Sequence, residues 1–477
     1  MNDQPVSRDP CREFSERERK SSLRMVILAI TFGMGFFPVV GNLAATPVFT
    51  GYIRFLGAGD FIFSLIMALP VLGGVIQVAG AYLLEITGRR KPLFLLSGFI
   101  HRLAFIPVAL IPFLYDEASR SRAVWPVAVL ISIAATGHSL TSISFMSWMG
   151  DLVPEESKGR FFSKRTMIST GMGAIAGLSA GFAMDHIQGL SGFATVILIA
   201  AAMGALDILM FFWVKEPRMI STGKAISLPR MFLIPFKDRN YFNFTAFACL
   251  WMFGINVASP FFNIYLLENM GLNYTSIYIA GPVLSSLVTI LFIRKWGNLT
   301  DRYGSRMVMF LCSCVQFFLP LFWLFATPGR ILIIMIANSL SGIFCPGFEM
   351  AQLNLSIWSA PPKNRPIYMA NFALIIAVFG TALAYICGGA FVEIMKGILE
   401  GTQIRFFFGQ TLNAFHLLFI LSGMIRLAAL VFLFKGFKEP NRPDLAESLG
   451  SLHQEFYQGT RKLIAKIRMK IRILFLK

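Results

Sequence analysis

The chain has 477 residues, of which 56% are hydrophobic and only 14% are charged. Its mean hydropathy is +0.65, whereas a soluble domain carries about 25% charged and about 45–50% apolar residues. This composition excludes an ordinary soluble protein, and with it a soluble enzyme. A net charge of +18 would suggest a polyanionic partner such as nucleic acid in a soluble protein. Here the distribution of the basic residues gives a different explanation.

Apolar stretches long enough to cross a bilayer recur along the chain, since about 20 apolar residues suffice for one crossing. The first 24 residues are charged and contain no apolar run before a small-residue cleavage site. We therefore expect no cleaved signal peptide and a first span that anchors the chain. Twelve spans are predicted, six without charge and six with polar interruptions: 25–53, 61–84, 241–267, 269–293, 307–329 and 366–392, and 92–115, 125–149, 166–188, 191–214, 331–358 and 413–435.

The basic residues fall mainly on one side of these spans. With the N-terminus inside, 35 of the 43 Lys and Arg residues lie in segments that face the cytoplasm. This positive-inside pattern predicts that both termini and residues 215–240 are cytoplasmic. Residues 215–240 and the basic amphipathic tail 436–477 are expected to contact anionic lipid at that face, and no nucleic acid is expected as a partner. The six cysteines lack metal-ligand spacing, so we expect no metal site.

The second half of the sequence repeats features of the first. Residues 83–90 and 299–306 match at an offset of 216, and Gly137 and Gly347 match at an offset of 210. The sequence Lys-Glu-Pro closes each half, at 215–217 and again at 438–440. Parallel repeats of six helices place a solute site between the halves, near the middle of the membrane. The expected organisation is a tail (1–24), a six-helix half (25–214), a middle segment (215–240), a second six-helix half (241–435) and a tail (436–477).

At these loops the chain resembles the major facilitator superfamily, whose signature between spans 2 and 3 and spans 8 and 9 is G-x-L-x-D-R-x-G-R-R. The resemblance implies an all-α integral membrane fold of twelve transmembrane helices in two parallel six-helix repeats. It also implies a secondary transporter without a cofactor, and the loop 151–162 is similar to that of bacterial members, so we expect the bacterial inner (cytoplasmic) membrane. The second copy matches at Gly297, Leu299, Asp301, Arg302, Gly304 and Arg306; the first keeps Leu83, Gly88, Arg89 and Arg90, with Glu85 in place of the aspartate.

These signature loops form the predicted cytoplasmic gate. A glycine permits a tight reversal between helices, an acid favours the positive end of a helix, and basic residues hold the loop at an anionic surface. In the family these loops help to close the cytoplasmic side while the other side is open. The alternative is that each charged residue only marks topology.

Four ionisable residues lie near the middle of predicted spans, where charge is costly unless it meets a partner or a cavity. They are Arg102, Asp207, Glu349 and Arg426, one acid and one base in each half. Because isolated charges at that depth are expensive, we expect the pairs Arg102 with Asp207 and Glu349 with Arg426.

Spans 1, 4, 7 and 10 line the pathway in the superfamily, which favours Glu349 and His138 as functional groups. A carboxyl that alternates between a charged and a protonated state can couple proton movement to conformational change; helix packing or substrate contact is the alternative role. Asn42, Asn256 and Gln352 are candidate hydrogen-bonding partners of a polar solute, or ties between helices. Phe36-Phe37 and Phe261-Phe262 could instead form an apolar wall, and the glycines of span 166–188 allow another helix to approach closely.

We therefore predict proton-coupled uptake of a small polar metabolite by alternating access. The alternatives are proton-coupled efflux of amphipathic drugs or lipids, and a non-transporting membrane sensor of the same fold. An enzyme is not expected, because the chain has no phosphate-binding loop and no His-Glu-x-x-His motif. The transporter is expected to work as a monomer.

Overall fold

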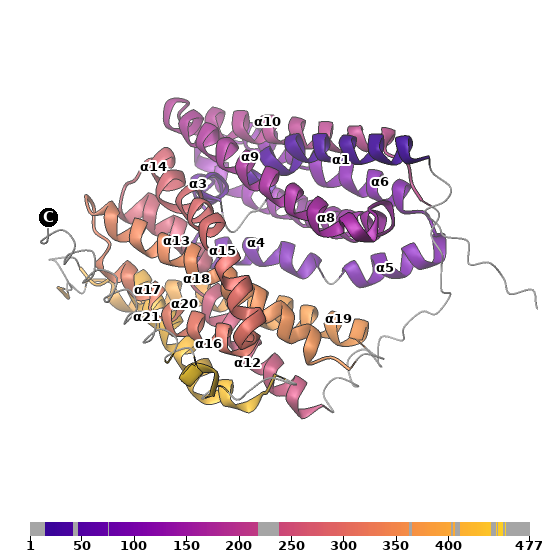
Figure 1. Cartoon of the computed structure of the whole chain (residues 1–477). Coiled ribbons are helices and arrows are strands. Elements are labelled where there is room, and N and C mark those ends of the chain that lie inside the picture. Colours follow the sequence, from indigo (N-terminus) through magenta and orange to yellow (C-terminus); the bar gives the residue numbers. More distant parts are fainter. Residues whose placement is uncertain are drawn as a thin grey trace, which may run out of the picture.

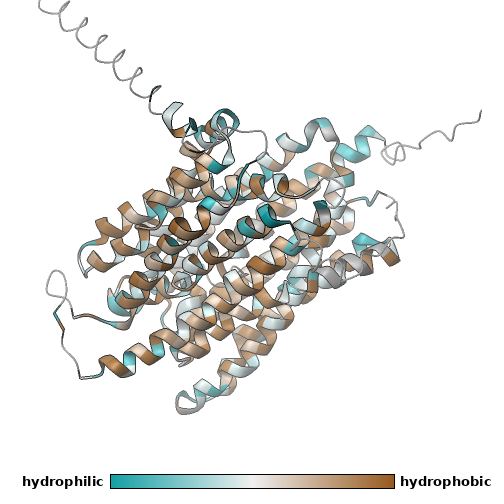
Figure 2. Ribbon diagram, turned by 90° about the horizontal axis from the view of Figure 1, so that it is seen from below, coloured by the Kyte–Doolittle hydropathy of each residue, from teal (hydrophilic) through white to brown (hydrophobic). Residues whose placement is uncertain are grey.

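The computed structural model describes residues 15–41, 46–74, 76–217, 238–361, 365–401, 404–405, 411–439, 445, 447–451 and 454. The described residues form helices joined by short turns and loops, with one isolated bridge between Arg405 and Thr411. Ten helices in this part of the chain are long and apolar enough to cross a membrane. Hydrophobic residues cover most of the length of these helices (Figure 2). The chain is a multi-pass, all-α membrane protein.

The N-terminal half contains the first six predicted spans. The first two are interrupted: the first is divided among α1, α2 and α3, and the second breaks after α4, where Pro70 and the pair Gly73-Gly74 weaken the helix. The helices of this half are α1 (Glu16–Phe36), α2 (Pro38–Gly41), α3 (Pro47–Phe55), α4 (Asp60–Gly73), α5 (Ile76–Thr87), α6 (Arg90–Leu103), α7 (Phe105–Leu110), η3 (Ile111–Leu114), η4 (Glu117–Ala123), α8 (Val124–Leu152), η5 (Glu155–Ser157), α9 (Lys158–His186), α10 (Gly189–Met210) and η6 (Phe211–Trp213).

The C-terminal half repeats this plan with more local distortion, including π-helical turns. Its helices are α12 (Arg239–Asn256), α13 (Ser259–Ile264), η8 (Tyr265–Asn269), α14 (Tyr274–Tyr278), η9 (Ile279–Val283), α15 (Leu284–Tyr303), α16 (Ser305–Gln316), α17 (Leu319–Phe322), η10 (Trp323–Phe325), α18 (Ile331–Trp358), α19 (Arg365–Ile375), η12 (Ile376–Ala382), α20 (Leu383–Leu399), α21 (Ala414–Ala428), η14 (Ala429–Leu433) and η15 (Phe434–Gly436).

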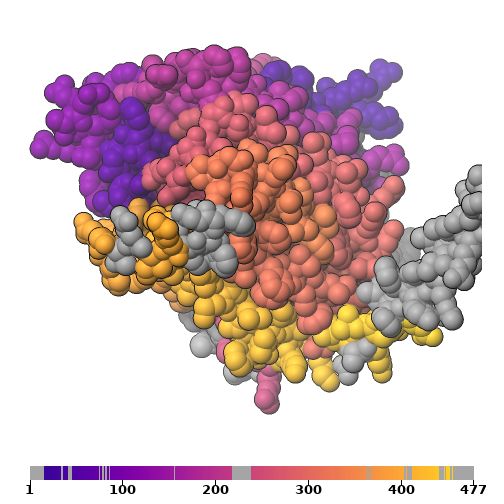
Figure 3. All heavy atoms as spheres, turned by 90° about the vertical axis from the view of Figure 1, so that its left-hand side faces the viewer, coloured from indigo at the N-terminus to yellow at the C-terminus, as the bar shows by residue number. Residues whose placement is uncertain are grey.

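Among the described residues, the main contacts between the two halves lie at one end of the molecule. Across the interface, α4 packs on η12 and α20, α9 packs on α14 and η9, and α3 packs on α13 and α14. These contacts lie at the end that carries α3, α13 and α14 in Figure 1, and Figure 3, which faces this end, shows atoms of the two halves in direct contact. We call this end the closed face and the opposite end, where α5, α6, α15 and α16 carry the signature loops, the open face.

The hydrophobic cores follow the same division. The largest cluster of buried residues includes side chains from both halves, such as Phe63 of α4 and Phe261 of α13, whose ring centroids are 6.2 Å apart. A second cluster belongs to the C-terminal half alone and a third to the N-terminal half alone. In α9 the buried residues all lie between Ala176 and Met184, near the closed face. The halves therefore share a core at the closed face and separate toward the open face.

Candidate functional site

The charged residues of the N-terminal half form a buried polar cluster. Arg102 of α6 donates a hydrogen bond from Nη2 to Oδ2 of Asp207 of α10 at 3.3 Å, and both side chains are buried. The predicted pair therefore exists. Gly33 of α1 lies so close that a Cβ added there would be 2.0 Å from Oδ2 of Asp207. This pair connects three helices, which is a structural use of the charges.

His101 extends this cluster, and sequence reasoning missed it although it precedes Arg102 directly. The Nη1 atom of Arg102 lies 3.2 Å from Nδ1 of His101. Because a guanidinium group only donates, Nδ1 must accept, and the ring proton is left on Nε2. The His101 ring also meets the ring of His138 of α8 edge to face, with centroids 4.8 Å apart. The cluster thus runs from Asp207 through Arg102 and His101 to His138.

His138 is the exposed end of that cluster. At about 100° per residue it lies on the opposite side of α8 from Trp125 and Val129, whose exposed apolar side chains are suited to lipid. Its imidazole therefore faces the space between the halves.

The contacts of Arg426 show that its predicted pairing with Glu349 is wrong. It is buried on α21 and donates from Nη1 to the backbone oxygen of Gln316 of α16 at 2.9 Å, and it forms no ion pair with Glu349. A Cβ added to Gly254 of α12 would lie 2.9 Å from Cγ of Arg426, as Gly33 lies against Asp207 in the other half. The expected pair between Arg426 and Glu349 is absent because the guanidinium of Arg426 already donates to a backbone carbonyl of the neighbouring helix.

Glu349 of α18 is exposed and takes part in no hydrogen bond or ion pair with the described residues. It lies nine residues before Trp358, and so on the opposite side of α18 from that exposed apolar ring. His138 and Glu349 occupy nearly equivalent positions in the repeat, 211 residues apart, and both face the space between the halves.

The uncharged polar candidates differ: Asn256 joins two helices by hydrogen bonds, whereas Gln352 is partly exposed. Nδ2 of Asn256 donates to the backbone oxygen of Gly380 and to Oγ1 of Thr381, both at 3.1 Å, so it ties α12 to η12. Gln352 is half-exposed on α18, and Asn42 lies outside the described residues.

Phe37 and Phe261 are core residues rather than a cavity wall. Phe36 lines a small apolar pocket of about 100 Å³ between α1, α9 and α10.

In the signature loops, the backbone has a positive φ at two positions, which favours glycine there: Gly88 with φ of +61° and Gly304 with φ of +91°.

The charged residues of these loops differ in burial. Arg90 is buried and pairs with Asp151 at the end of α8, within its own half. Asp301 and Arg302 are exposed, and Arg302 lies over the Tyr303 ring. Arg89 is exposed as well, Gly297 is half-buried, and Glu85 lies on α5.

The repeated Lys-Glu-Pro segments explain part of this geometry, which the sequence did not assign. Glu216 accepts from the backbone N–H of Arg90 at 2.6 Å, at the start of α6. Glu439 accepts from the backbone N–H of Arg306 at 2.8 Å, at the start of α16. Each half therefore closes with a carboxylate that caps the helix after the signature loop.

Comparison with known proteins agrees with this fold. A sequence model of the Major Facilitator Superfamily matches residues 282–475. The nucleoside transporter NupG superposes with a TM-score of 0.68 at 15% identity, covering 87% of this chain and 100% of that one. Residues 282–475 therefore match the family that the signature loops resemble, and the chain shares the fold of these solved transporters.

Other solved structures similar to this chain include a bacterial homologue of the human lysosomal transporter Spinster in an inward-facing conformation. Its TM-score is 0.64 at 16% identity, with coverage of 90% of this chain and 100% of that one. A D-xylose–proton symporter has a TM-score of 0.63 at 15% identity, with coverage of 88% and 98%. No curated protein sequence matches the chain.

Proposed function

We propose that this transporter moves a small polar solute by alternating access and couples the movement to protons through Glu349. The observation that carries the proposal is the exposed carboxylate of Glu349 in the middle of α18, which has no partner among the described residues. The other three ionisable groups near the middle of the membrane are buried and serve as ties between helices. Glu349 is thus the group best suited to bind a proton or a solute.

The chemistry follows from the cost of burying charge. While the cavity is open, water can solvate a carboxylate, but closure removes that water and favours either protonation or a bound cationic group. Protonation of Glu349 would let the halves close around a neutral group, and release of the proton would follow reopening. His138, at the nearly equivalent position in the other half, offers a donor to the same solute. The polar character of these two groups favours a hydroxylated or zwitterionic solute.

The distribution of basic residues supports the orientation. The open face carries the signature loops, which lie among the Lys- and Arg-rich segments, so we assign it to the cytoplasm. On this proposal the conformation is inward-open, the membrane is a bacterial inner membrane, and both termini are cytoplasmic. The five-part division of the chain, the monomeric state and the contact of the basic segments with anionic lipid are part of the same proposal.

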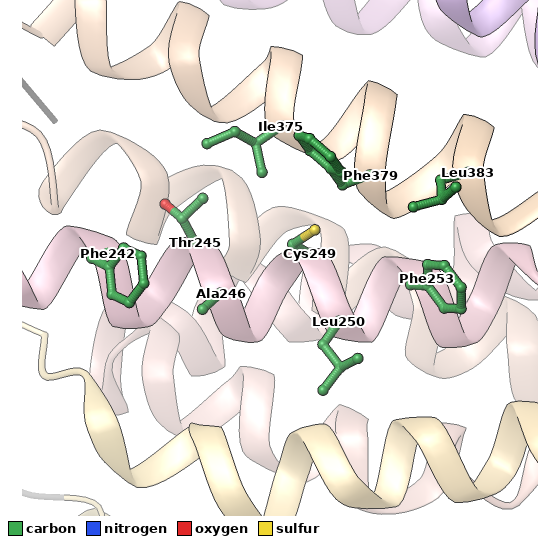
Figure 4. A pocket seen from close by; sticks show the side chains of 9 residues that line it. All are labelled: Phe242, Thr245, Ala246, Cys249, Leu250, Phe253, Ile375, Phe379 and Leu383. Carbon is green, nitrogen blue, oxygen red and sulfur yellow. The ribbon is translucent and has the colours of Figure 1, made fainter. Parts of the chain in front are cut away.

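A second candidate function, efflux of amphipathic compounds, is favoured by an apolar pocket of about 380 Å³. It lies between α12 and the helix formed by α19, η12 and α20, and Figure 4 shows Phe379 and Leu383 reaching toward α12. A lipophilic molecule would find almost no polar group there. The lining residues are Phe242, Thr245, Ala246, Cys249, Leu250, Phe253, Ile375, Phe379 and Leu383.

Transport in proteoliposomes tests the proposal. Radiolabelled uridine and D-xylose are suitable first probes, because the similar structures include a nucleoside transporter and a D-xylose–proton symporter. They are followed by amino acids and other polar metabolites. An inward proton gradient should increase accumulation by the wild-type transporter, and Glu349→Gln should abolish that increase while solute exchange continues.

Glu117→Gln is the matched control, because Glu117 lies on the closed face and its ion pair in the described part of the chain is with Arg120 of its own helix. It should transport as the wild type does. Gradient-driven accumulation that survives in Glu349→Gln would refute proton coupling through this residue. Flux of dyes but of no polar solute would instead favour the efflux function and direct mutagenesis to Cys249 and Phe379.

A further inference from the structure

The closed face contains a short sequence motif that occurs once in each half of the chain. Residues 181–185 read Gly-x-x-x-Asp and residues 389–393 read Gly-x-x-x-Glu, at an offset of 208. The first copy lies in the last turns of α9 and the second in the corresponding part of α20. Each copy packs against the beginning of a helix from the other half. The repeat at the cytoplasmic loops thus has a counterpart at the opposite face.

The first copy holds the start of α14. A Cβ added to Gly181 would lie 3.0 Å from Cα of Thr275, so only glycine lets the two helices approach this closely. One turn later, the Asp185 carboxylate accepts from the backbone N–H groups of Tyr274 at 2.8 Å and Thr275 at 3.0 Å. These are the first N–H groups of the helix that continues through η9 and α15 to Tyr303, and they have no partner within the helix.

The second copy holds the start of α4 in the same way. A Cβ added to Gly389 would lie 1.9 Å from Oγ of Ser64 and 3.0 Å from the backbone oxygen of Asp60. The Glu393 carboxylate accepts from the backbone N–H of Phe61, the second residue of α4, at 3.0 Å. Both copies therefore combine a close helix approach with a carboxylate at the positive end of a helix.

Two ion pairs between the halves lie beside the second copy. Nζ of Lys396 is 2.6 Å from Oδ2 of Asp60, and Nη2 of Arg54 donates to Oε2 of Glu268 at 2.9 Å. Asp60 is largely buried and also pairs with Arg54 at 3.2 Å. Fully or partly exposed ion pairs contribute little by themselves, so the buried backbone contacts of the two motifs are the more specific part of the closure.

We propose that Asp185 and Glu393 form a twin latch that sets the balance between the state open at one face and the state open at the other. Each latch joins helices from different halves, so both must break when the closed face opens. The contacts at Gly181 and Gly389 would break in the same movement. The latch lies at the opposite end of the helices from the signature loops, and it is independent of the solute and of Glu349.

Hydrogen–deuterium exchange measured by mass spectrometry on the purified full-length protein tests the proposal. Loss of a capping carboxylate should raise the population of the opened form about fivefold. In Asp185→Ala, exchange should therefore rise about fivefold at residues 274–280. It should rise similarly at 61–67, which Asp185 does not touch, and it should fall in α5 as the open face closes.

Glu393→Ala should give the same result from the other motif, and the double variant should show about a 25-fold effect, because the two sites share no partner. Asp185→Asn keeps a hydrogen-bond acceptor without the charge, so it should give a smaller increase in exchange at the same residues. This variant tests the proposal if Asp185→Ala does not fold. Glu117→Ala is the control on the same face and should change neither site. Faster exchange confined to 274–280 in Asp185→Ala, or unchanged exchange in all variants, would overturn the proposal.

Discussion

Individual buried charges in this protein pack against glycines on the neighbouring helix. Gly33 admits the Asp207 carboxylate against α1, and Gly254 admits the Arg426 side chain against α12. At each glycine, the charged group occupies the space that a side chain would otherwise fill. A charge near the middle of a membrane protein is tolerable only when such a site supplies both room and a hydrogen-bonding partner.

Gly33→Ala should therefore destabilise the protein strongly. The new Cβ would lie about 2 Å from three side-chain atoms of Asp207, so the ion pair with Arg102 would have to move or break, at a cost of about 3 kcal/mol. Thermal unfolding followed by tryptophan fluorescence measures the loss. Gly171→Ala on α9, where a Cβ would meet nothing within 4 Å, is the control and should leave the midpoint unchanged. Equal midpoints for the two variants would contradict this account of Gly33.

At the scale of elements, the helices after the signature loops depend on caps from distant residues. The Lys-Glu-Pro segments return to the open face after the sixth helix of each half, where Glu216 reaches α6 and Glu439 reaches α16. Because the first N–H groups of a helix have no partner in the helix itself, a carboxylate at that point stabilises the helix and fixes the loop.

Glu439→Ala should cost about 1 kcal/mol, as does the loss of other helix caps, and should loosen the start of α16. Amide exchange at residues 305–311 should increase about fivefold while exchange in α6 stays unchanged. Glu216→Ala should show the reverse pattern, with the increase in α6. An increase at both helices in either variant would mean that the caps act through the whole protein rather than locally.

At the scale of the whole molecule, the halves share one core at the closed face and keep separate cores at the open face. In this conformation the named partners of Arg90 and Arg306, which are Asp151, Glu216 and Glu439, lie in the same half as the residues they contact. We therefore expect the signature loops to engage the other half when the open face closes, which is the role of the predicted cytoplasmic gate.

Asp301→Asn should weaken that gate and favour the observed conformation. Combined with Asp185→Ala and Glu393→Ala, it should reverse much of the increase in exchange at residues 61–67, because the two faces close in alternation. Asp301→Glu keeps the charge and should leave the increase intact. If Asp301→Asn left exchange in the triple variant at the level of the double variant, Asp301 would have no part in the gate.

The sequence by itself determined that the chain is a multi-pass membrane protein, where its spans lie, that its two halves repeat, and which family it resembles, because these follow from hydropathy, charge and spacing along the chain. It also located the charged residues that need partners, and it found the Arg102–Asp207 pair. Only the tertiary structure decided which partners are used. Arg426 bonds to a backbone carbonyl, His101 joins His138, and Asp185 and Glu393 reach helices some 90 and 330 residues away in sequence. The reason is that hydropathy is a property of each segment, whereas the distance between two side chains depends on how all the helices pack.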